Sequence, residues 1–353
     1  MSKRVLILYT GGTFGMDPKL RVPKLKPEQL RAQFMRRVPE LGELADCTVE
    51  IVFNLDSAHL GPSHWLELAA AVKTGWKTHD GIVILHGTDT LAYTASALSY
   101  LLRPCLKPVI LTGAQKPLAS IRTDARRNLI AAVEIAAHGP RPLLNQVGVF
   151  FDHRLWQGNR VRKRSALDFQ AFDAPLSAPL AVVGTSIRYS ESTAEGSAKS
   201  PSRGTRHALK QSPATEPRFN ERVAMLHVTP GFPAQAITEG LLPRIDGLVL
   251  VVYPSGTAPT QDPEFLHLLR AARIKGVPII AVGEGAAESP GEAAQIPVYA
   301  AAKAVLDQGA IWGGGMTPEA AYTKLGLALG QGWNGETLRK SLALNWAGER
   351  PET

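Results

Sequence analysis

Four short polar segments each follow a short apolar run, and together they carry the side chains best suited to chemistry. The segments are residues 10–15 (TGGTFG), 56–58 (DSA), 86–90 (HGTDT) and 112–115 (TGAQ). In open parallel sheets, ligands bind beyond the carboxyl ends of the strands. If the four apolar runs are parallel strands, these hydroxyl, carboxylate and amide groups meet at one edge of the sheet. The sequence therefore predicts a functional site there.

The first segment places Thr13 among the glycines Gly11, Gly12 and Gly15. Neither the phosphate-loop pattern GxxxxGK[ST] nor the dinucleotide pattern GxGxxG is present, because the glycines have the wrong spacing and no lysine follows them. One interpretation is that the glycines only form a tight turn. The other is that they expose the Thr13 hydroxyl beside backbone N–H donors, where it can act as a nucleophile once a base removes its proton.

The third segment carries Thr88 and Asp89 at a predicted strand-to-helix junction, where a helix N-terminus favours negative charge. Taken alone, Asp89 is typical of a helix cap. Two side chains are candidate bases for a threonine hydroxyl. His86 is equally consistent with a buried core histidine. Lys163 can accept a proton near neutral pH if desolvation lowers its pKa, although most lysines are surface charges.

Apolar runs alternate along the chain with amphipathic segments of helical length. This alternation predicts an α/β fold of two domains: a larger N-terminal domain, with a mainly parallel sheet covered by helices on both faces, and a smaller C-terminal α/β domain. The expected strands are 5–9, 49–53, 81–85, 108–111, 147–151, 223–228, 247–252 and 277–282. The expected helices are 27–38, 91–102, 123–137, 318–329, and two that begin at Pro62 and Pro263.

We predict domain boundaries at 1–189 and 222–353. Residues 190–221 between them are polar, rich in serine, proline and charge, and lack a core pattern. This segment is predicted to be a flexible linker or insertion, either an inert tether or a binding arm.

Composition excludes several classes of protein. The net charge is +8, but charged residues make up only 20% of the chain and the basic clusters do not alternate with aromatic residues, which disfavours nucleic-acid binding. No apolar run approaches the length of a membrane span. The apolar run 5–9 ends at Thr-Gly-Gly, so a first strand is favoured over a signal peptide. Two distant cysteines imply no disulfide framework and fit a reducing cytoplasm.

These motifs are similar to those of one family. The chain resembles the bacterial-type L-asparaginases, and the cytoplasmic type I group more closely than the periplasmic type II group. The similarity covers nearly the whole chain outside the linker. It rests on residues 9–16 (YTGGTFGM), 86–98 (HGTDTLAYTASAL), 111–118 (LTGAQKPL), 121–124 (IRTD), 158–160 (GNR) with Lys163, 229–231 (TPG), 316–320 (MTPEA) and 323–325 (TKL).

The resemblance implies an activity and a set of residue roles. The family hydrolyses the side-chain amide of asparagine to aspartate and ammonia through an acyl-threonine, without metal or cofactor, as a homodimer or homotetramer with sites at subunit contacts. Thr13 matches the nucleophile, while Thr88, Asp89 and Lys163 match its proton-handling group. Ser57 and Asp89 match the groups that bind the substrate α-carboxylate and α-ammonium. The strand-end residues Asp56 and Gln115 are further substrate-binding candidates.

The chain departs from the family pattern in three places, one of which is the segment 190–220, which is longer than expected for the linker. Arg21 stands where a mobile loop of the family carries a catalytic tyrosine. Residues 283–295 lack similarity to the type I segment linked with allosteric asparagine binding, and either Glu288 or Glu292 is a candidate for the acidic group that a neighbouring subunit contributes. We therefore predict no such regulation, and the preference between asparagine and glutamine stays open.

Two alternative functions remain. The missing tyrosine fits a catalytically weak protein that binds or senses an amino acid. An amidotransferase-type subunit is the other alternative. It is disfavoured because such chains usually carry an additional N-terminal domain, whereas the first signature here begins at residue 9.

Overall fold

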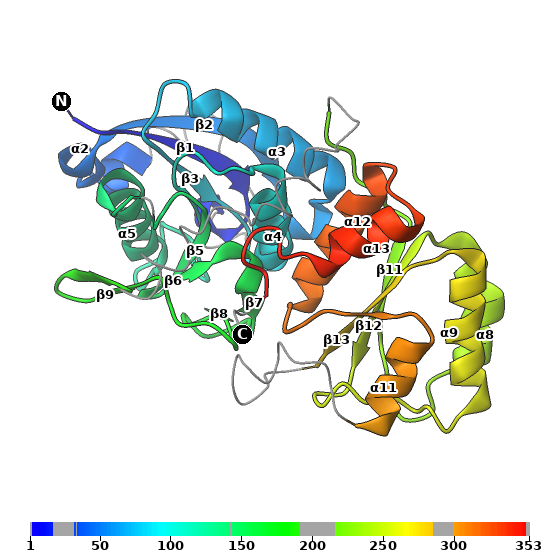
Figure 1. Ribbon diagram of the computed structural model, residues 1–353. Coiled ribbons are helices and arrows are strands. Elements are labelled where there is room, and N and C mark those ends of the chain that lie inside the picture. Colours follow the sequence, from blue (N-terminus) through cyan, green and yellow to red (C-terminus); the bar gives the residue numbers. More distant parts are fainter. Residues whose placement is uncertain are drawn as a thin grey trace. The chain divides into compact units, whose positions relative to one another are not determined.

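The computed structural model describes residues 2–16, 32, 34–141, 143–190, 216–284 and 299–350. The chain divides into two compact units, each with its own main sheet (Figure 1). The first unit comprises Met1–Ala174 with Ala178–Ser200, and the second comprises Pro175–Ser177 with Pro201–Thr353. No helix in the described parts of the chain is long and apolar enough to cross a membrane.

The first unit contains an eight-stranded sheet in the order β10-β9-β6-β5-β4-β3-β1-β2. The five strands from β2 to β5 are parallel, and β6, β9 and β10 continue the sheet antiparallel. The parallel strands are β1 (Arg4–Gly11), β2 (Asp46–Leu55), β3 (Gly81–Leu85), β4 (Val109–Thr112) and β5 (Val147–Phe151). The antiparallel strands are β6 (Arg154–Gln157), β9 (Ala181–Val183) and β10 (Ile187–Tyr189).

Helices cover both faces of this sheet, as the sequence predicted. A Cβ atom at Gly75 of α3 (Pro62–Gly75) would lie 2.6 Å from Leu6 and 2.9 Å from Ile82, which are partners in the ladder between β1 and β3. A Cβ at Gly81 would lie 2.4 Å from the carbonyl oxygen of Ala136 in α5 (Ala125–His138). Successive residues of a strand point to opposite faces, so α3 and α5 lie on opposite sides. The helices α2 (Leu41–Leu44) and α4 (Leu91–Leu101) complete these layers.

The second unit contains four parallel strands in the order β11-β12-β13-β14. Leu248 and Leu250 of β12 share a core with Phe265 and Leu268 of α9, while Gly247 faces Leu325 of α12. Helices therefore cover both faces of this sheet as well. The elements are β11 (Val223–His227), β12 (Gly247–Val252), β13 (Ile279–Gly283), β14 (Ile311–Trp312), α8 (Ala234–Ala236), α9 (Pro263–Lys275), α11 (Ala300–Asp307), α12 (Pro318–Gly330) and α13 (Gly335–Ala343).

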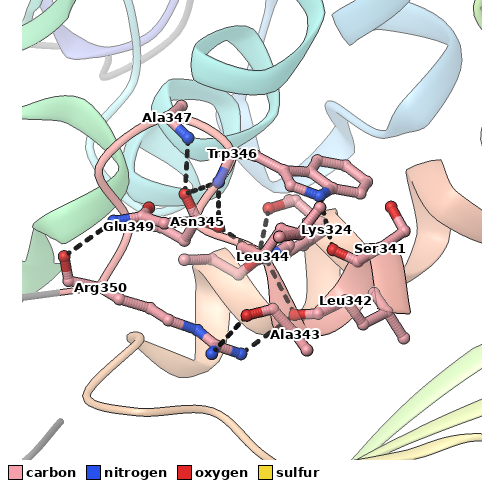
Figure 2. Close-up of polar contacts among 12 residues, drawn as sticks. Lys324, Ser341, Leu342, Ala343, Leu344, Asn345, Trp346, Ala347, Glu349 and Arg350 are labelled. Atoms are coloured by element: carbon pink, nitrogen blue, oxygen red, sulfur yellow. Dashed lines mark hydrogen bonds and ion pairs between the residues drawn. The ribbon is translucent and has the colours of Figure 1, made fainter. Parts of the chain in front are cut away.

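The end of the chain folds back on this unit as a C-terminal hook, defined here as residues 344–350 (Figure 2). Glu349 of the hook pairs with Lys324 of α12 at 2.6 Å, and both side chains are fully buried. Glu349 also accepts hydrogen bonds from the backbone nitrogens of Trp346 and Ala347, and the Trp346 ring lies 5.0 Å from the lysine nitrogen. The hook is thus fastened by a buried and well-partnered ion pair.

The predicted core elements agree with the structure, and the short ones were not foreseen. The strands 81–85, 147–151 and 247–252 have the predicted bounds, and Asp262 and Thr317 cap α9 and α12. The antiparallel strands after β5 were not predicted. The helix expected at 27–38 lies partly outside the described residues, and its described end contains a turn in which Val38 N donates to Phe34 O at 2.9 Å. Most of the predicted linker, 191–215, also lies outside them, so the domain boundaries stay a prediction.

Candidate active site

The loops that follow the first four parallel strands meet at one edge of the sheet, where three glycines allow them to approach closely. A Cβ atom at Gly12 would lie 2.5 Å from the Cα of Gly87, and a Cβ at Gly87 would lie 2.6 Å from Oγ of Ser57. A Cβ at Gly113 would lie 2.4 Å from the carbonyl oxygen of His86. No side chain fits at these three positions without moving the opposite loop. The convergence predicted for the four polar segments is therefore present.

Glycine is also required by backbone conformation after β1. Gly11 has φ +117° and Gly12 has φ +80°, a region that residues with a side chain rarely adopt. Gly12 N donates to the carbonyl oxygen of Leu55 at the end of β2 at 3.1 Å. This turn delivers Thr13 to the short 3-10 helix η1 (Thr13–Gly15), where Thr13 is half-buried. The first segment is thus a tight turn that also places a threonine just beyond the carboxyl end of β1.

Two further threonines tie strand ends together. Thr10 donates to the carbonyl oxygen of Leu85 at 3.1 Å, and Thr112 donates to that of Phe150 at 2.7 Å. Both side chains are fully buried. Both hydroxyls are therefore committed to holding strand ends.

Ser57 and Asp56 follow β2 on the 3-10 helix η2 (Ser57–His59). Ser57 is buried, and its carbonyl oxygen accepts a hydrogen bond from Thr90 Oγ1 at 2.7 Å. Asp56 is exposed and caps η2, its Oδ1 accepting from Ala58 N at 3.0 Å. The second loop is thereby attached to the third.

Lys163, Thr88 and Asp89 form one hydrogen-bonded group. Lys163 Nζ lies 2.7 Å from Thr88 Oγ1 and 2.7 Å from Asp89 Oδ1. The Thr88 residue is 8% exposed, the Lys163 side chain 18% and the Asp89 side chain 65%. The Lys163 amine therefore lies between a nearly buried hydroxyl, that of Thr88, and a carboxylate that is open to solvent, that of Asp89. The Asp89 carboxylate accepts from Lys163, and the residue at the N-cap of α4 is Thr90 rather than Asp89.

A two-stranded ribbon positions Lys163. In this ribbon β7 (Arg162–Lys163) pairs with β8 (Phe172–Asp173), and Lys163 lies opposite Phe172. The Phe172 ring is buried and lies 5.0 Å from that of Phe151, at the end of β5. Because Phe151 ends the strand beside β4, the ribbon carries the lysine to the edge where the loops meet. The sequence identified the residue but not the ribbon.

His86 is a structural residue. Its Nδ1 lies 2.7 Å from the carbonyl oxygen of Gly87, and its Nε2 lies 2.9 Å from Thr94 Oγ1, which accepts from Trp65 Nε1 at 3.0 Å. Burial lowers the pKa of His86 to about 4, opposed by the Gly87 hydrogen bond. The imidazole is therefore neutral at pH 7 with both nitrogens engaged. Of the two candidate bases, only Lys163 contacts a threonine of the site.

Gln115 occupies the fourth loop, after β4. Its Nε2 donates to the carbonyl oxygen of Asp168 at 2.9 Å, which ties this loop to the segment that follows β7. Three residues later along the same loop, Leu118 N donates to the carbonyl oxygen of Phe14 in η1 at 3.1 Å. The fourth loop is therefore in direct contact with the helical turn that carries Thr13.

Sequence reasoning missed the residues that hold this fourth loop. Asp124 is 3% exposed and accepts from the backbone nitrogens of Gln115, at 2.9 and 3.1 Å, and Lys116, at 3.0 Å. Asn128 donates to the carbonyl oxygen of Gly113 at 3.0 Å. Burial raises the pKa of Asp124, although these hydrogen bonds act in the opposite direction. The signal was present in the motif 121–124, but an aspartate just before a helix is ordinarily a cap.

Three of the predicted features lie outside the described residues: Arg21, Glu288 and Glu292. Among the residues that are described, no group of three or more histidine, cysteine, aspartate or glutamate side chains is placed to hold a metal ion.

The arrangement can support nucleophilic chemistry. Thr13 lies on the glycine turn that follows β1, and Thr88 on the adjoining loop is hydrogen-bonded to the Lys163 amine. A hydroxyl between a nucleophile and an amine can transfer a proton between them. Backbone N–H groups of the converging loops are suited to stabilising an oxyanion.

Comparison with known proteins points to the same chemistry over the whole chain. The sequence is 35% identical to L-asparaginase 1 of Escherichia coli (strain K12), over 98% of both chains. It is 32% identical to the human 60 kDa lysophospholipase over 96% of this chain and 60% of that longer protein. The crystal structure of L-asparaginase I from Vibrio cholerae covers 99% of both chains with a TM-score of 0.83 at 33% identity. Since residues 4–195 match the family described as asparaginase, N-terminal, and residues 222–342 match the glutaminase/asparaginase C-terminal domain, the chain belongs to the asparaginase family.

Proposed function

We propose that this chain is an asparaginase that hydrolyses the side-chain amide of L-asparagine to L-aspartate and ammonia. The observation that carries the proposal is the position of Lys163 Nζ, 2.7 Å from both Thr88 Oγ1 and Asp89 Oδ1, on the edge that also carries Thr13. The 35% identity to L-asparaginase 1 of Escherichia coli over 98% of both chains supports the choice of substrate.

In the proposed acylation step, Thr13 Oγ attacks the amide carbon of asparagine. Its proton passes through the hydroxyl of Thr88 to Lys163 in its neutral form, and then to the leaving nitrogen, which departs as ammonia. Backbone N–H groups of the strand-end loops stabilise the oxyanion, a contribution of about 3–4 kcal/mol per donor. Water then attacks the acyl-threonine ester, which releases aspartate and restores the Thr13 hydroxyl. The step requires no metal or cofactor.

In the same proposal, Ser57 binds the α-carboxylate and Asp89 the α-ammonium of the substrate. Ser57 is buried against Gly87, and its loop is bound to Thr90, so it is suited to a fixed contact. Asp89 is the exposed carboxylate of the group and is accessible to an incoming cation. Asp56, next to Ser57, and Gln115 are further residues that we assign to the substrate. An analogue that lacks either charged group leaves its partner unpaired and is bound poorly.

The test is ammonia release from L-asparagine at neutral pH, measured for the wild type, Thr13→Ala and Thr74→Ala, with L-glutamine as the comparison substrate. Thr74 is an exposed threonine of α3, so its variant is a matched control. We expect release by the wild type and the control, and none by Thr13→Ala. Undiminished release by Thr13→Ala contradicts the assigned nucleophile. A folded wild type that binds asparagine without releasing ammonia contradicts the enzyme proposal and favours an amino-acid sensor.

We further propose a homodimer or homotetramer that acts in the cytoplasm, with domains at 1–189 and 222–353 joined by the linker 190–221. The family resemblance supports the assembly, and the two free cysteines, Cys47 and Cys105, are compatible with a reducing compartment. Analytical ultracentrifugation checks the assembly, and a single species with the mass of one chain contradicts it.

A further inference from the structure

Asp124 has an unusual position for an aspartate at a helix start. It is the residue before α5, yet its carboxylate makes no capping hydrogen bond to that helix. The neighbouring Thr123 accepts from Ala125 N at 3.0 Å instead. By contrast, Asp262 at the start of α9 accepts from Glu264 N at 2.9 Å, as an aspartate cap ordinarily does. The Asp124 carboxylate is therefore committed elsewhere.

Two of its partners are backbone nitrogens of the fourth loop, and a third is the Asn128 side chain of α5. The carboxylate accepts from Gln115 N and Lys116 N, and Asn128 Nδ2 lies 3.3 Å from its Oδ2. Asn128 Nδ2 also donates to the carbonyl oxygen of Gly113, and Thr123 Oγ1 donates to the carbonyl oxygen of Lys116 at 3.1 Å. The start of α5 thus fastens the loop 113–116 at four backbone groups.

The fastened loop leads directly to the nucleophile proposed above. Leu118 N donates to the carbonyl oxygen of Phe14, the residue after Thr13. The Phe14 ring is buried and packs edge-on against Phe34 at 5.3 Å, so this turn is held from two sides. If the fourth loop loosened, the turn that carries Thr13 would lose the constraint from Leu118 and keep only the packing of Phe14 on Phe34.

We propose that Asp124 is a positioning residue for the reaction, which acts through the loop 113–118 to hold Thr13 in its attacking position. The inference rests on the proposed function of Thr13. Asp124 binds Gln115, a further residue assigned to the substrate, only at its backbone nitrogen, and it hydrogen-bonds to neither Ser57 nor Asp89, which bind the α-carboxylate and the α-ammonium in the proposal. Its loss should therefore slow the chemical step and leave binding of the charged groups nearly unchanged.

The experiment compares kcat and KM for ammonia release from L-asparagine in the wild type, Asp124→Ala, Asp124→Asn and Asn128→Ala, using the full chain. A misplacement of about 1 Å can cost about 100-fold in rate. We expect Asp124→Ala to lower kcat about 10- to 100-fold with KM within about threefold. Asp124→Asn keeps one acceptor oxygen and should recover part of kcat. If Asp124→Ala fails to fold, Asp124→Asn and Asn128→Ala still test the proposal.

The matched control is Asp262→Ala, which removes a helix-start aspartate from the second unit and should lower the unfolding temperature without lowering kcat. The double variant Asp124→Asn/Asn128→Ala should lose less than the product of the two single effects, because both residues hold one loop. Unchanged kcat in the Asp124 variants, or a loss confined to KM, overturns the inference. Equal kcat losses in Asp124→Ala and Asp262→Ala do so too. An inactive wild type is a failure of the proposed function instead.

Discussion

Two lysine–carboxylate pairs in this chain have similar geometry and opposite surroundings. Lys163 and Asp89 approach at 2.7 Å with 18% and 65% of their side chains exposed, and Lys324 and Glu349 approach at 2.6 Å with both side chains fully buried. Distance does not distinguish them. The difference lies in what else each lysine binds.

Lys324 is surrounded by fixed partners. It donates to the carbonyl oxygens of Leu342 and Leu344 as well as to Glu349. Burial by itself would raise the pKa of Glu349, but the charge and hydrogen bond of Lys324, with the backbone N–H donors, hold that pKa below its ordinary value. The Glu349 carboxylate is therefore held in its charged form beside Lys324, and the pair is suited to structure rather than proton transfer.

Lys163 instead donates to one exposed carboxylate and one threonine hydroxyl. A hydroxyl can pass a proton on, whereas a backbone carbonyl cannot, so the same side chain is suited to chemistry in one region and to fold stability in the other. The contrast predicts that removing Lys163 affects turnover and removing Lys324 affects unfolding.

The largest expected effect is on turnover. Lys163→Met keeps the length of the side chain and removes the amine that contacts Thr88. General acid–base catalysis is worth about 100- to 10,000-fold, so kcat/KM for ammonia release should fall by about 1,000-fold. Asp89 is 65% exposed and stays solvated when the amine is lost, so the pair should contribute only about 0–1 kcal/mol to stability and thermal unfolding should change little.

A third pair supplies the control for that variant. Lys340 and Glu336 on α13 lie 3.5 Å apart, with 74% and 69% of their side chains exposed. Lys340→Met removes an exposed lysine outside the site and should leave both turnover and unfolding nearly unchanged. If Lys163→Met lowers the unfolding temperature strongly and leaves kcat/KM intact, the division between the two regions is wrong.

The next effect is on stability. Lys324→Met leaves Glu349 buried and charged without its partner, which costs about 3–5 kcal/mol of unfolding free energy in comparable buried pairs. Activity should persist at temperatures where the variant stays folded. Chemical denaturation of the wild type and the variant, monitored beside ammonia release, measures both quantities.

Removing both charges sharpens this second prediction. Lys324→Met/Glu349→Gln leaves no buried charge and keeps an oxygen for the N–H groups of Trp346 and Ala347, so it should recover at least half of the lost stability. A double variant as unstable as Lys324→Met would show that the lysine acts through its backbone contacts or its packing on Trp346, and not through the charge of Glu349.

The sequence predicted the parts of the site that follow regular strands. The segments holding Thr13, Ser57 and Thr88 could be assigned to one edge because the apolar runs before them are five or more residues long and alternate with helices. The ribbon that carries Lys163 could not, because its strands β7 and β8 are two residues each and have no period to recognise. A short strand is defined by its partner, which a sequence does not specify.

The missed polar residues have a different physical cause. Asp124 reads as a helix cap from its position, and only the structure shows its carboxylate directed to the preceding loop. Thr94 reads as one residue of an apolar helix, although it connects Trp65 to His86 across the packing of α3 and α4. Side-chain direction in both cases is set by tertiary packing, which local propensity does not contain.

The smallest of the predicted effects concerns His86. This residue lies near Lys163 in the first unit, but it resembles the Lys324–Glu349 pair in being buried and hydrogen-bonded. It is buried and has a partner at each ring nitrogen. Burial lowers its pKa from 6.5 to about 4. Above pH 6.5 the histidine is neutral in both the folded and the unfolded chain, so its full contribution to stability is present. Between pH 6.5 and about 4 the unfolded chain binds the proton first, and stability is lost as the pH falls.

The loss attributable to His86 is about 3 kcal/mol over that interval. The measurement is the unfolding free energy of the wild type and His86→Gln from pH 7 to 4.5. The variant should be less stable at pH 7, because it disturbs the contacts with Gly87 and Thr94, and its stability should fall less steeply with acid. Parallel pH dependences would mean that the imidazole is protonated in the folded chain. His86 would then again compete with Lys163 as the base. The distinction between Lys163, assigned to proton transfer, and the buried groups assigned to stability would then fail for His86.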